Sequence, residues 1–265
     1  MPDNELSGSN ESDRQTSWLR FGGARGSLER RTLMALALSA LLVLAFIRIA
    51  AYIAGETPGE FDAHIILALR NPADLADPVG PAWFEEAMRD ITALGGTIVL
   101  VIVSLAAFGF LVMTGKSHAA YMLAASVIGA IILSQTLKAG FGRPRPDLVP
   151  HGARIYTMSF PSGHAMMSAA VYLTLAALLA RTWTQKRVKV FIISLAALIT
   201  LAVGASRVYL GVHWPTDVVA GWVAGSAWAI FCWSIMIWLQ QRGEIEPEND
   251  SSLATERTND LPVNN

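Results

Sequence analysis

Six apolar segments, each near the length that crosses a membrane, constrain the fold of this chain more than any other feature. They span residues 32–54, 93–113, 119–139, 165–180, 188–206 and 218–239. A helix of roughly 20 apolar residues spans the hydrocarbon core of a bilayer. Charged residues make up only 15% of the chain, whereas soluble domains average about 25%. The sequence therefore predicts an all-α, polytopic membrane protein built as a six-transmembrane-helix bundle.

The polar segments around these runs set the domain organisation. Residues 32–54 exceed the roughly 7–15 apolar residues of a signal peptide, so they predict a membrane helix rather than a cleaved leader. We expect a flexible cytoplasmic tail over 1–31, a membrane domain over 32–239 and a disordered acidic cytoplasmic tail over 240–265. The polar connection 55–92 contains two short stretches that are candidates for interfacial helices.

Basic residues in the predicted loops indicate the orientation. They flank the first, second, fourth and fifth helices at Arg30, Arg31, Lys116, Arg181, Lys186, Arg187 and Lys189. Cytoplasmic loops are enriched in Lys and Arg, so both termini are predicted to lie in the cytoplasm, on the inner face of a bacterial cytoplasmic membrane. The opposite, periplasmic side also carries cations, at Lys138, Arg143, Arg145 and Arg154. Ligand binding explains these better than topology does.

Composition excludes several classes of partner. The net charge of -1 provides no overall basic field, so no nucleic-acid partner is expected. The single cysteine, Cys232, excludes an internal disulfide and a multi-cysteine metal site. The sequence leaves the oligomeric state open.

The first motif follows the third predicted helix. Lys138 ends that helix, and Arg145 comes seven residues later, before Pro146, in a turn rich in Gly and Pro. These residues restrict and direct the backbone, so the two cations have defined positions. The alternative interpretation is a basic loop that contacts anionic lipid headgroups.

The second motif, Pro161-Ser162-Gly163-His164, directly precedes the fourth predicted helix. Ser162 suits the N-cap position, and the free backbone N–H groups that follow it form a site for anions. Gly163 allows a ligand to approach closely, with His164 beside it. The alternative is a plain helix cap with an interfacial histidine.

The third motif joins the fifth and sixth predicted helices and contains Arg207, His213 and Asp217. If the first turn of the sixth helix includes both, His213 and Asp217 lie near one face, because they are four residues apart. A carboxylate bonded to one imidazole nitrogen fixes the tautomer and leaves the other nitrogen free to attack. The alternative is an interfacial ion pair.

The predicted topology brings the three motifs together. The third and fifth helices end at the outer face with Lys138 and Arg207. The fourth and sixth begin there, with His164 and His213 near the positive ends of their helix dipoles. Charge so close to hydrocarbon is costly, so this cluster indicates a functional site.

A metal site is the competing interpretation of two histidines and an aspartate. Lys138, Arg145 and Arg207 would repel a metal cation, and the sequence shows no evident third strong ligand. The same cations suit a phosphate, whose transfer depends mainly on positioning and charge neutralisation. We therefore expect no metal and no cofactor.

In these motifs the chain resembles the type 2 phosphatidic acid phosphatase superfamily, which also includes bacterial acid phosphatases and vanadium haloperoxidases. The family pattern is Lys-x6-Arg-Pro, then Pro-Ser-Gly-His, then Ser-Arg-x5-His-x3-Asp. All three parts occur here in order, and the match covers roughly residues 90–239. The resemblance implies the integral-membrane branch of the family, with its site near the outer surface.

The resemblance also implies a role for each motif residue. His213 would be the nucleophile that forms a phosphohistidine, Asp217 would orient it, and His164 would protonate the leaving oxygen. The phosphoryl oxygens would be held by Lys138, Arg145, Ser162, the Gly163 backbone and Arg207. The implied reaction is hydrolysis of a lipid phosphate monoester or pyrophosphate, of the phosphatidic acid, phosphatidylglycerol phosphate, undecaprenyl diphosphate or lipid A phosphate type.

Two other functions remain open from the sequence. Vanadate-dependent halide oxidation would use the same kind of pocket, although six membrane spans argue against the peroxidase branch, which looks soluble. A non-catalytic lipid-binding or scrambling protein would keep the fold with a degenerate site, whereas His164, His213 and Asp217 are all intact here.

Overall fold

The computed structural model describes residues 9–54, 59–149 and 158–242, most of which are helical. The elements are α1 (Ser9–Ala54), α2 (Glu60–Ala68), β1 (Arg70–Asn71), β2 (Asp74–Pro78), α3 (Ala82–Ala93), α4 (Thr97–Met113), α5 (Ser117–Phe141), α6 (Gly163–Arg181), α7 (Lys186–Tyr209) and α8 (Pro215–Gln241). The strands β1 and β2 pair antiparallel in a small ribbon.

Five helices in the described part of the chain are long and apolar enough to cross a membrane. Their spans are Glu29–Ala54, Ser117–Phe141, Gly163–Arg181, Lys186–Tyr209 and Pro215–Leu239. A sixth span is present if α3 and α4, which meet at a bend of 48°, count as one. The predicted all-α, multi-pass membrane fold is confirmed.

The second predicted span begins later than expected, because a break separates α4 from the short helix α3 that precedes it. The sequence predicted one apolar helix over 93–113, whereas α3 ends at Ala93 and α4 begins at Thr97. Gly95 lies in the break, where a Cβ would be 2.4 Å from Val203 and 3.3 Å from the Cβ of His164. The absent side chain therefore lets the break pack against α6 and α7.

Close packing organises the helices that carry the motifs. Helix α4 contacts α5, α5 contacts α6, and α6 contacts α7. Gly225 of α8 faces α6 so closely that a Cβ would lie 2.2 Å from the carbonyl oxygen of Met166. Within a bilayer, moving an apolar side chain from lipid to a helix interface gains little free energy. Close van der Waals contact through small residues therefore holds such helices together. Residues Ala165, Met166 and Ala169 of α6 are fully buried.

Contacts within the chain divide it into two compact units, Leu38–Trp233 and Met1–Ala37 with Ser234–Asn265. The motif residues all belong to the first unit. Where the sequence predicted a flexible tail over 1–31, α1 already begins at Ser9. Residues 9–31 contain no proline that would interrupt the helix. Most of the acidic tail predicted over 240–265 lies outside the described residues.

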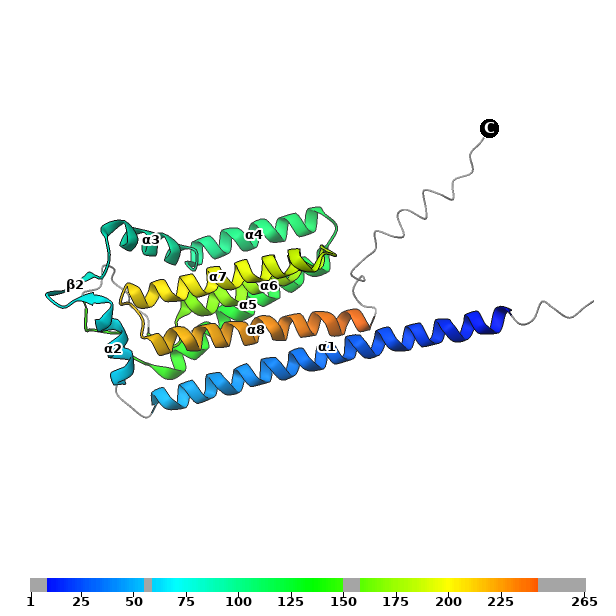
Figure 1. Ribbon diagram of the computed structural model, residues 1–265, viewed down its shortest axis with the longest axis horizontal. Coiled ribbons are helices and arrows are strands. Elements are labelled where there is room, and N and C mark those ends of the chain that lie inside the picture. Colours follow the sequence, from blue (N-terminus) through cyan, green and yellow to red (C-terminus); the bar gives the residue numbers. More distant parts are fainter. Residues whose placement is uncertain (1–8, 55–58, 150–157, 243–265) are drawn as a thin grey trace, which may run out of the picture. The chain divides into compact units, whose positions relative to one another are not determined.

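Four helix ends meet at one end of the larger unit. There α5 ends, α6 begins, α7 ends and α8 begins, while α2, the β-ribbon and α3 lie at the same end (Figure 1). Hydrogen bonds join these outer elements to the bundle, from Arg207 to Thr92 and from Tyr209 to the carbonyl of Val79. The fold thus carries all three sequence motifs to one location.

Candidate active site

A cavity of about 290 Å³ lies where these helix ends meet. Its lining includes six of the eight residues predicted from the motifs, namely Lys138, Arg145, Gly163, His164, Arg207 and His213. The other two, Ser162 and Asp217, are buried directly behind it, next to Gly163 and His213. Gly95, Thr97, Ser134, Gln135 and Met167 complete the lining.

His213 lies in the loop before α8, because that helix begins only at Pro215. Its ring is 1% exposed, with Nδ1 at 3.5 Å from Oδ2 of Asp217 and Nε2 at 3.0 Å from Nη1 of Arg145. Burial lowers the pKa of His213 to about 3, although the bond to Asp217 opposes this shift. The ring is therefore neutral near pH 7. Its partners assign the proton to Nδ1 and the lone pair to Nε2.

Asp217 is fully buried, and several donors hold its carboxylate in one orientation. Oδ1 accepts a hydrogen bond from Nη1 of Arg143 at 2.6 Å. Oδ2 accepts one from the backbone N–H of Trp214 at 3.1 Å and another from the Ser159 hydroxyl. These hydrogen bonds keep Oδ2 of the carboxylate facing His213.

His164 lies in the first turn of α6, which begins at Gly163. Ser162 occupies the predicted N-cap position, but its side chain makes no capping hydrogen bond, and its buried Oγ has no partner within the part of the chain that the structure describes. Free N–H groups at such a helix end attract anions. A Cβ at Gly163 would lie 3.3 Å from Cε of Lys138, so glycine leaves room for the lysine.

Three cations surround the cavity. Lys138 and Arg145 each donate to a backbone carbonyl, at 2.9 Å and 2.7 Å, and Arg207 donates to Oγ1 of Thr92 at 3.1 Å. Arg207 is 8% exposed, and its buried Nε has no partner among the described residues. Like charges repel and an unpaired buried donor is costly, so an anion in this cavity relieves both penalties.

The donor set suits an anion better than a metal ion. Among the residues that the structure describes, no group of three or more His, Cys, Asp or Glu side chains could hold a metal. His164 and His213 share the cavity with Lys138, Arg145 and Arg207. Metal sites of the zinc type instead gather anionic or neutral ligands.

Ser159 and Thr92 hydrogen-bond to predicted site residues, although the sequence did not predict a role for either. Ser159 contacts both Asp217 and Nδ1 of His213, the latter at 3.3 Å. Thr92, at the end of α3, accepts the hydrogen bond from Arg207. A lone hydroxyl in a polar segment carries no signal in a single sequence, so only the folded chain reveals these contacts.

Arg143 corrects one prediction. The sequence placed it among outer cations that bind a ligand, but it does not line the cavity. It pairs instead with Asp62 at 2.9 Å and Asp217 at 2.6 Å. The cause is its packing in the fold: the Thr216 hydroxyl and the Trp214 ring also contact its guanidinium, which leaves it buried among them. Arg154, from the same predicted group, lies outside the described residues.

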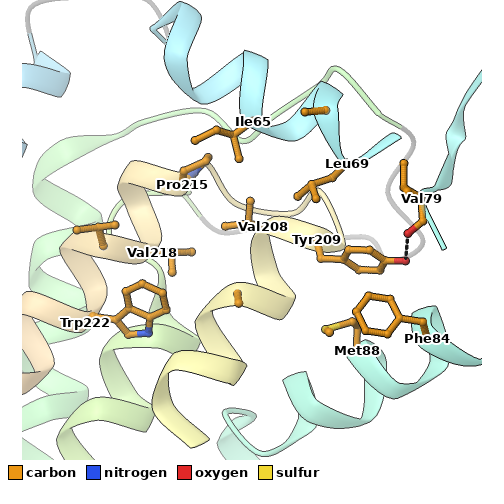
Figure 2. Close-up of a pocket in the computed structure, with 13 residues that line it drawn as sticks. Ile65, Leu69, Val79, Phe84, Met88, Val208, Tyr209, Pro215, Val218 and Trp222 are labelled. Atoms are coloured by element: carbon orange, nitrogen blue, oxygen red, sulfur yellow. Dashed lines mark hydrogen bonds between the residues drawn. The ribbon is translucent and has the colours of Figure 1, made fainter. Parts of the chain in front are cut away.

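A second cavity of about 480 Å³ has a different character. It is lined by residues of α2, α3, α7 and α8 and of the loop that follows β2. Figure 2 shows Tyr209 and Phe84 side by side at one end of it, with the Tyr209 hydroxyl donating to the Val79 carbonyl at 3.1 Å. Among the described residues, this cavity is lined mostly by apolar side chains, without the cations and histidines of the first.

Comparisons with known proteins agree with this geometry. The family model of the PAP2 superfamily matches residues 119–241, which include all eight predicted site residues. Phosphatidylglycerophosphatase B of Bacillus subtilis is 36% identical over 151 residues, covering 54% of this chain and 70% of that protein. Lipid A 1-phosphatase of Rhizobium etli is 29% identical over 175 residues, covering 56% and 71%.

A solved structure supports the same relationship. The crystal structure of a transmembrane PAP2 type phosphatidylglycerolphosphate phosphatase from Bacillus subtilis aligns with a TM-score of 0.67 and 29% identity, covering 75% of this chain and 95% of that one. The membrane-spanning bundle and its cationic, histidine-containing cavity define an integral-membrane phosphatase. The chain belongs to the PAP2 superfamily.

Proposed function

We propose that this protein hydrolyses a lipid phosphate monoester or pyrophosphate through a phosphohistidine intermediate and releases inorganic phosphate. The observation that carries the proposal is the meeting of His164, His213 and three cations in one cavity, at the ends of membrane-spanning helices. Relatives named for phosphatidylglycerophosphate and lipid A phosphate support a lipid substrate.

Substrate binding is proposed to use the cations of the cavity. Lys138, Arg145 and Arg207 neutralise the phosphoryl oxygens. The Nε of Arg207, which none of the described residues engages, supplies one donor. The Gly163 backbone and the Ser162 hydroxyl, at the start of α6, supply further hydrogen bonds. Donors held in place before the reaction stabilise the charge of the transition state.

The first chemical step is proposed to be attack by Nε2 of His213 on phosphorus. A bond from Nε2 to phosphorus forms as the bond to the lipid oxygen breaks, and His164 gives that oxygen a proton. Asp217 holds the Nδ1 proton and stabilises the positive charge that develops on the ring. In the second step water attacks phosphorus, the bond to Nε2 breaks, and His164 takes up the water proton.

The location of the chemistry is part of the proposal. The basic loops lie at the opposite ends of the spanning helices from the cavity, which supports a cavity on the periplasmic side of the cytoplasmic membrane. Both termini would then be cytoplasmic. Substrates would come from the outer leaflet.

Phosphate release by the purified protein tests the proposal. The substrates are phosphatidic acid, phosphatidylglycerol phosphate, undecaprenyl diphosphate and lipid A phosphate, each assayed with and without a chelator. We expect release from at least one lipid, insensitivity to the chelator, and loss of release in His213→Ala protein that is shown to be folded. Full release by His213→Ala would refute the mechanism. Lipid binding without release would favour a non-catalytic protein, and peroxide-driven halide oxidation with vanadate would favour the peroxidase chemistry.

A further inference from the structure

A buried chain of charges extends from the candidate site to α2. Arg143 lies between two carboxylates, with Nη2 at 2.9 Å from Oδ2 of Asp62 and Nη1 at 2.6 Å from Oδ1 of Asp217. Their exposed fractions are 1% for Asp62, 9% for Arg143 and 0% for Asp217. Removing three charges from water is costly, so their geometry must be well matched.

Asp62 also holds the first turn of α8, the helix that carries Asp217. Its Oδ1 accepts from the backbone N–H of Thr216 at 3.0 Å, and its Oδ2 accepts from the Thr216 hydroxyl at 2.5 Å. Arg143 donates to the same hydroxyl at 2.9 Å. A carboxylate from α2 thus supplies the acceptor that the start of α8 lacks.

These contacts set the rotation of the Asp217 carboxylate. With Oδ1 engaged by Arg143, Oδ2 is left for the Ser159 hydroxyl, the Trp214 N–H and Nδ1 of His213. The guanidinium of Arg143 also lies over the Trp214 ring, 5.6 Å from its centroid, which restricts its movement. Arg143 is therefore held on two sides while it holds Asp217.

We propose that Asp62 and Arg143 are positioning residues that act through Asp217 to aim His213 at the phosphoryl group. α2 then belongs to the catalytic apparatus, although Asp62 lies well outside residues 119–241, which the family model matches. This inference rests on the proposed function, because it assigns the attack on phosphorus to His213. Neither residue lines the cavity, so neither touches the substrate.

A purely structural role for the pair predicts different behaviour. If Asp62 only anchored α2, its loss would lower the melting temperature and the folded fraction, while the folded molecules kept their kcat. If it positions His213, its loss lowers kcat with little change in KM, because the groups that bind phosphate are untouched.

Asp62→Asn is the decisive variant, because it keeps the shape of the side chain and removes its charge. In mixed micelles, with the substrate that the wild type hydrolyses best, we expect kcat to fall about 10- to 100-fold and KM to change less than about 3-fold. Glu60→Gln is the matched control: Glu60 is an exposed acid on the same helix, and the variant should keep wild-type kcat. Arg143→Gln should resemble Asp62→Asn, and the double variant should be no worse than the more impaired single variant.

Ligand binding provides a readout that does not need turnover. Inorganic phosphate requires only the cavity donors, whereas vanadate also bonds to the attacking nitrogen. We expect Asp62→Asn to bind phosphate like the wild type but vanadate more weakly. If the wild type binds both anions and hydrolyses no lipid, the proposed function fails while this comparison still tests the positioning. Wild-type kcat in folded Asp62→Asn, or equal vanadate affinity in both proteins, would overturn the inference.

Discussion

At the residue scale, the proposed chemistry depends on a histidine that is buried without a charge. His213 is 1% exposed and has a carboxylate on one ring nitrogen and Arg145 on the other. Burial lowers its pKa to about 3, so the lone pair needed for attack is present at neutral pH. In the proposed mechanism, the Asp217 carboxylate stabilises the positive charge that the ring gains in the transition state.

The same burial links stability to pH. The unfolded chain has a histidine pKa near 6.5, so between that value and about 3 the unfolded state binds a proton that folded His213 does not. The free energy of unfolding is therefore highest above the histidine pKa of the unfolded chain. It decreases as the pH falls through this window. When the pH is lowered from about 7 to about 4.5, we expect the melting temperature of His213→Gln to fall less than that of the wild type.

A second histidine supplies the control for this measurement. His64 is exposed on α2, so His64→Gln should keep the acid sensitivity of the wild type. Equal acid sensitivity in the wild type and His213→Gln would contradict a buried neutral ring.

At the element scale, the lengths of apolar runs predict the membrane helices well, because about 20 apolar residues have few alternatives to crossing a bilayer. The break between α3 and α4 was not predictable, because Gly95 acquires its role only when Val203 and His164 lie against it. The motif residues were predictable from their order and spacing. Asp62 and Ser159 were not, because their contacts form only in the folded chain: Asp62 is joined to Asp217 through Arg143, and Ser159 bonds to Asp217 directly.

Close packing of α8 on α6 leads to a prediction about two glycines. A Cβ at Gly225 would lie 2.2 Å from the Met166 carbonyl, whereas a Cβ at Gly109 of α4 would meet nothing within 4 Å. Gly225→Ala should cost about 1–3 kcal/mol or more through overpacking. Gly109→Ala should gain about 0.5–1 kcal/mol, because alanine loses less backbone freedom in a helix. Thermal unfolding of both variants in detergent checks this, and equal melting temperatures would contradict the packing.

At the scale of the whole molecule, the proposed orientation can be tested by labelling. Asp74 of β2 lies at the cavity end of the bundle, and Gln185 lies before α7, among the basic residues. The native thiol, Cys232, is buried, which keeps the background low. A membrane-impermeant maleimide added to intact spheroplasts should label Asp74→Cys directly, and Gln185→Cys only after permeabilisation. The reverse pattern would place the cavity on the cytoplasmic side.

Trapping the phosphorylated protein tests the assignment of His213 most directly. The wild type is mixed with a lipid labelled with ³²P in its phosphate, quenched with alkali within milliseconds, and digested. The mechanism predicts an acid-labile, alkali-stable label on the peptide that contains His213, and none in His213→Ala. A label that persists in folded His213→Ala, or a wild type that releases phosphate without ever carrying label, would contradict it.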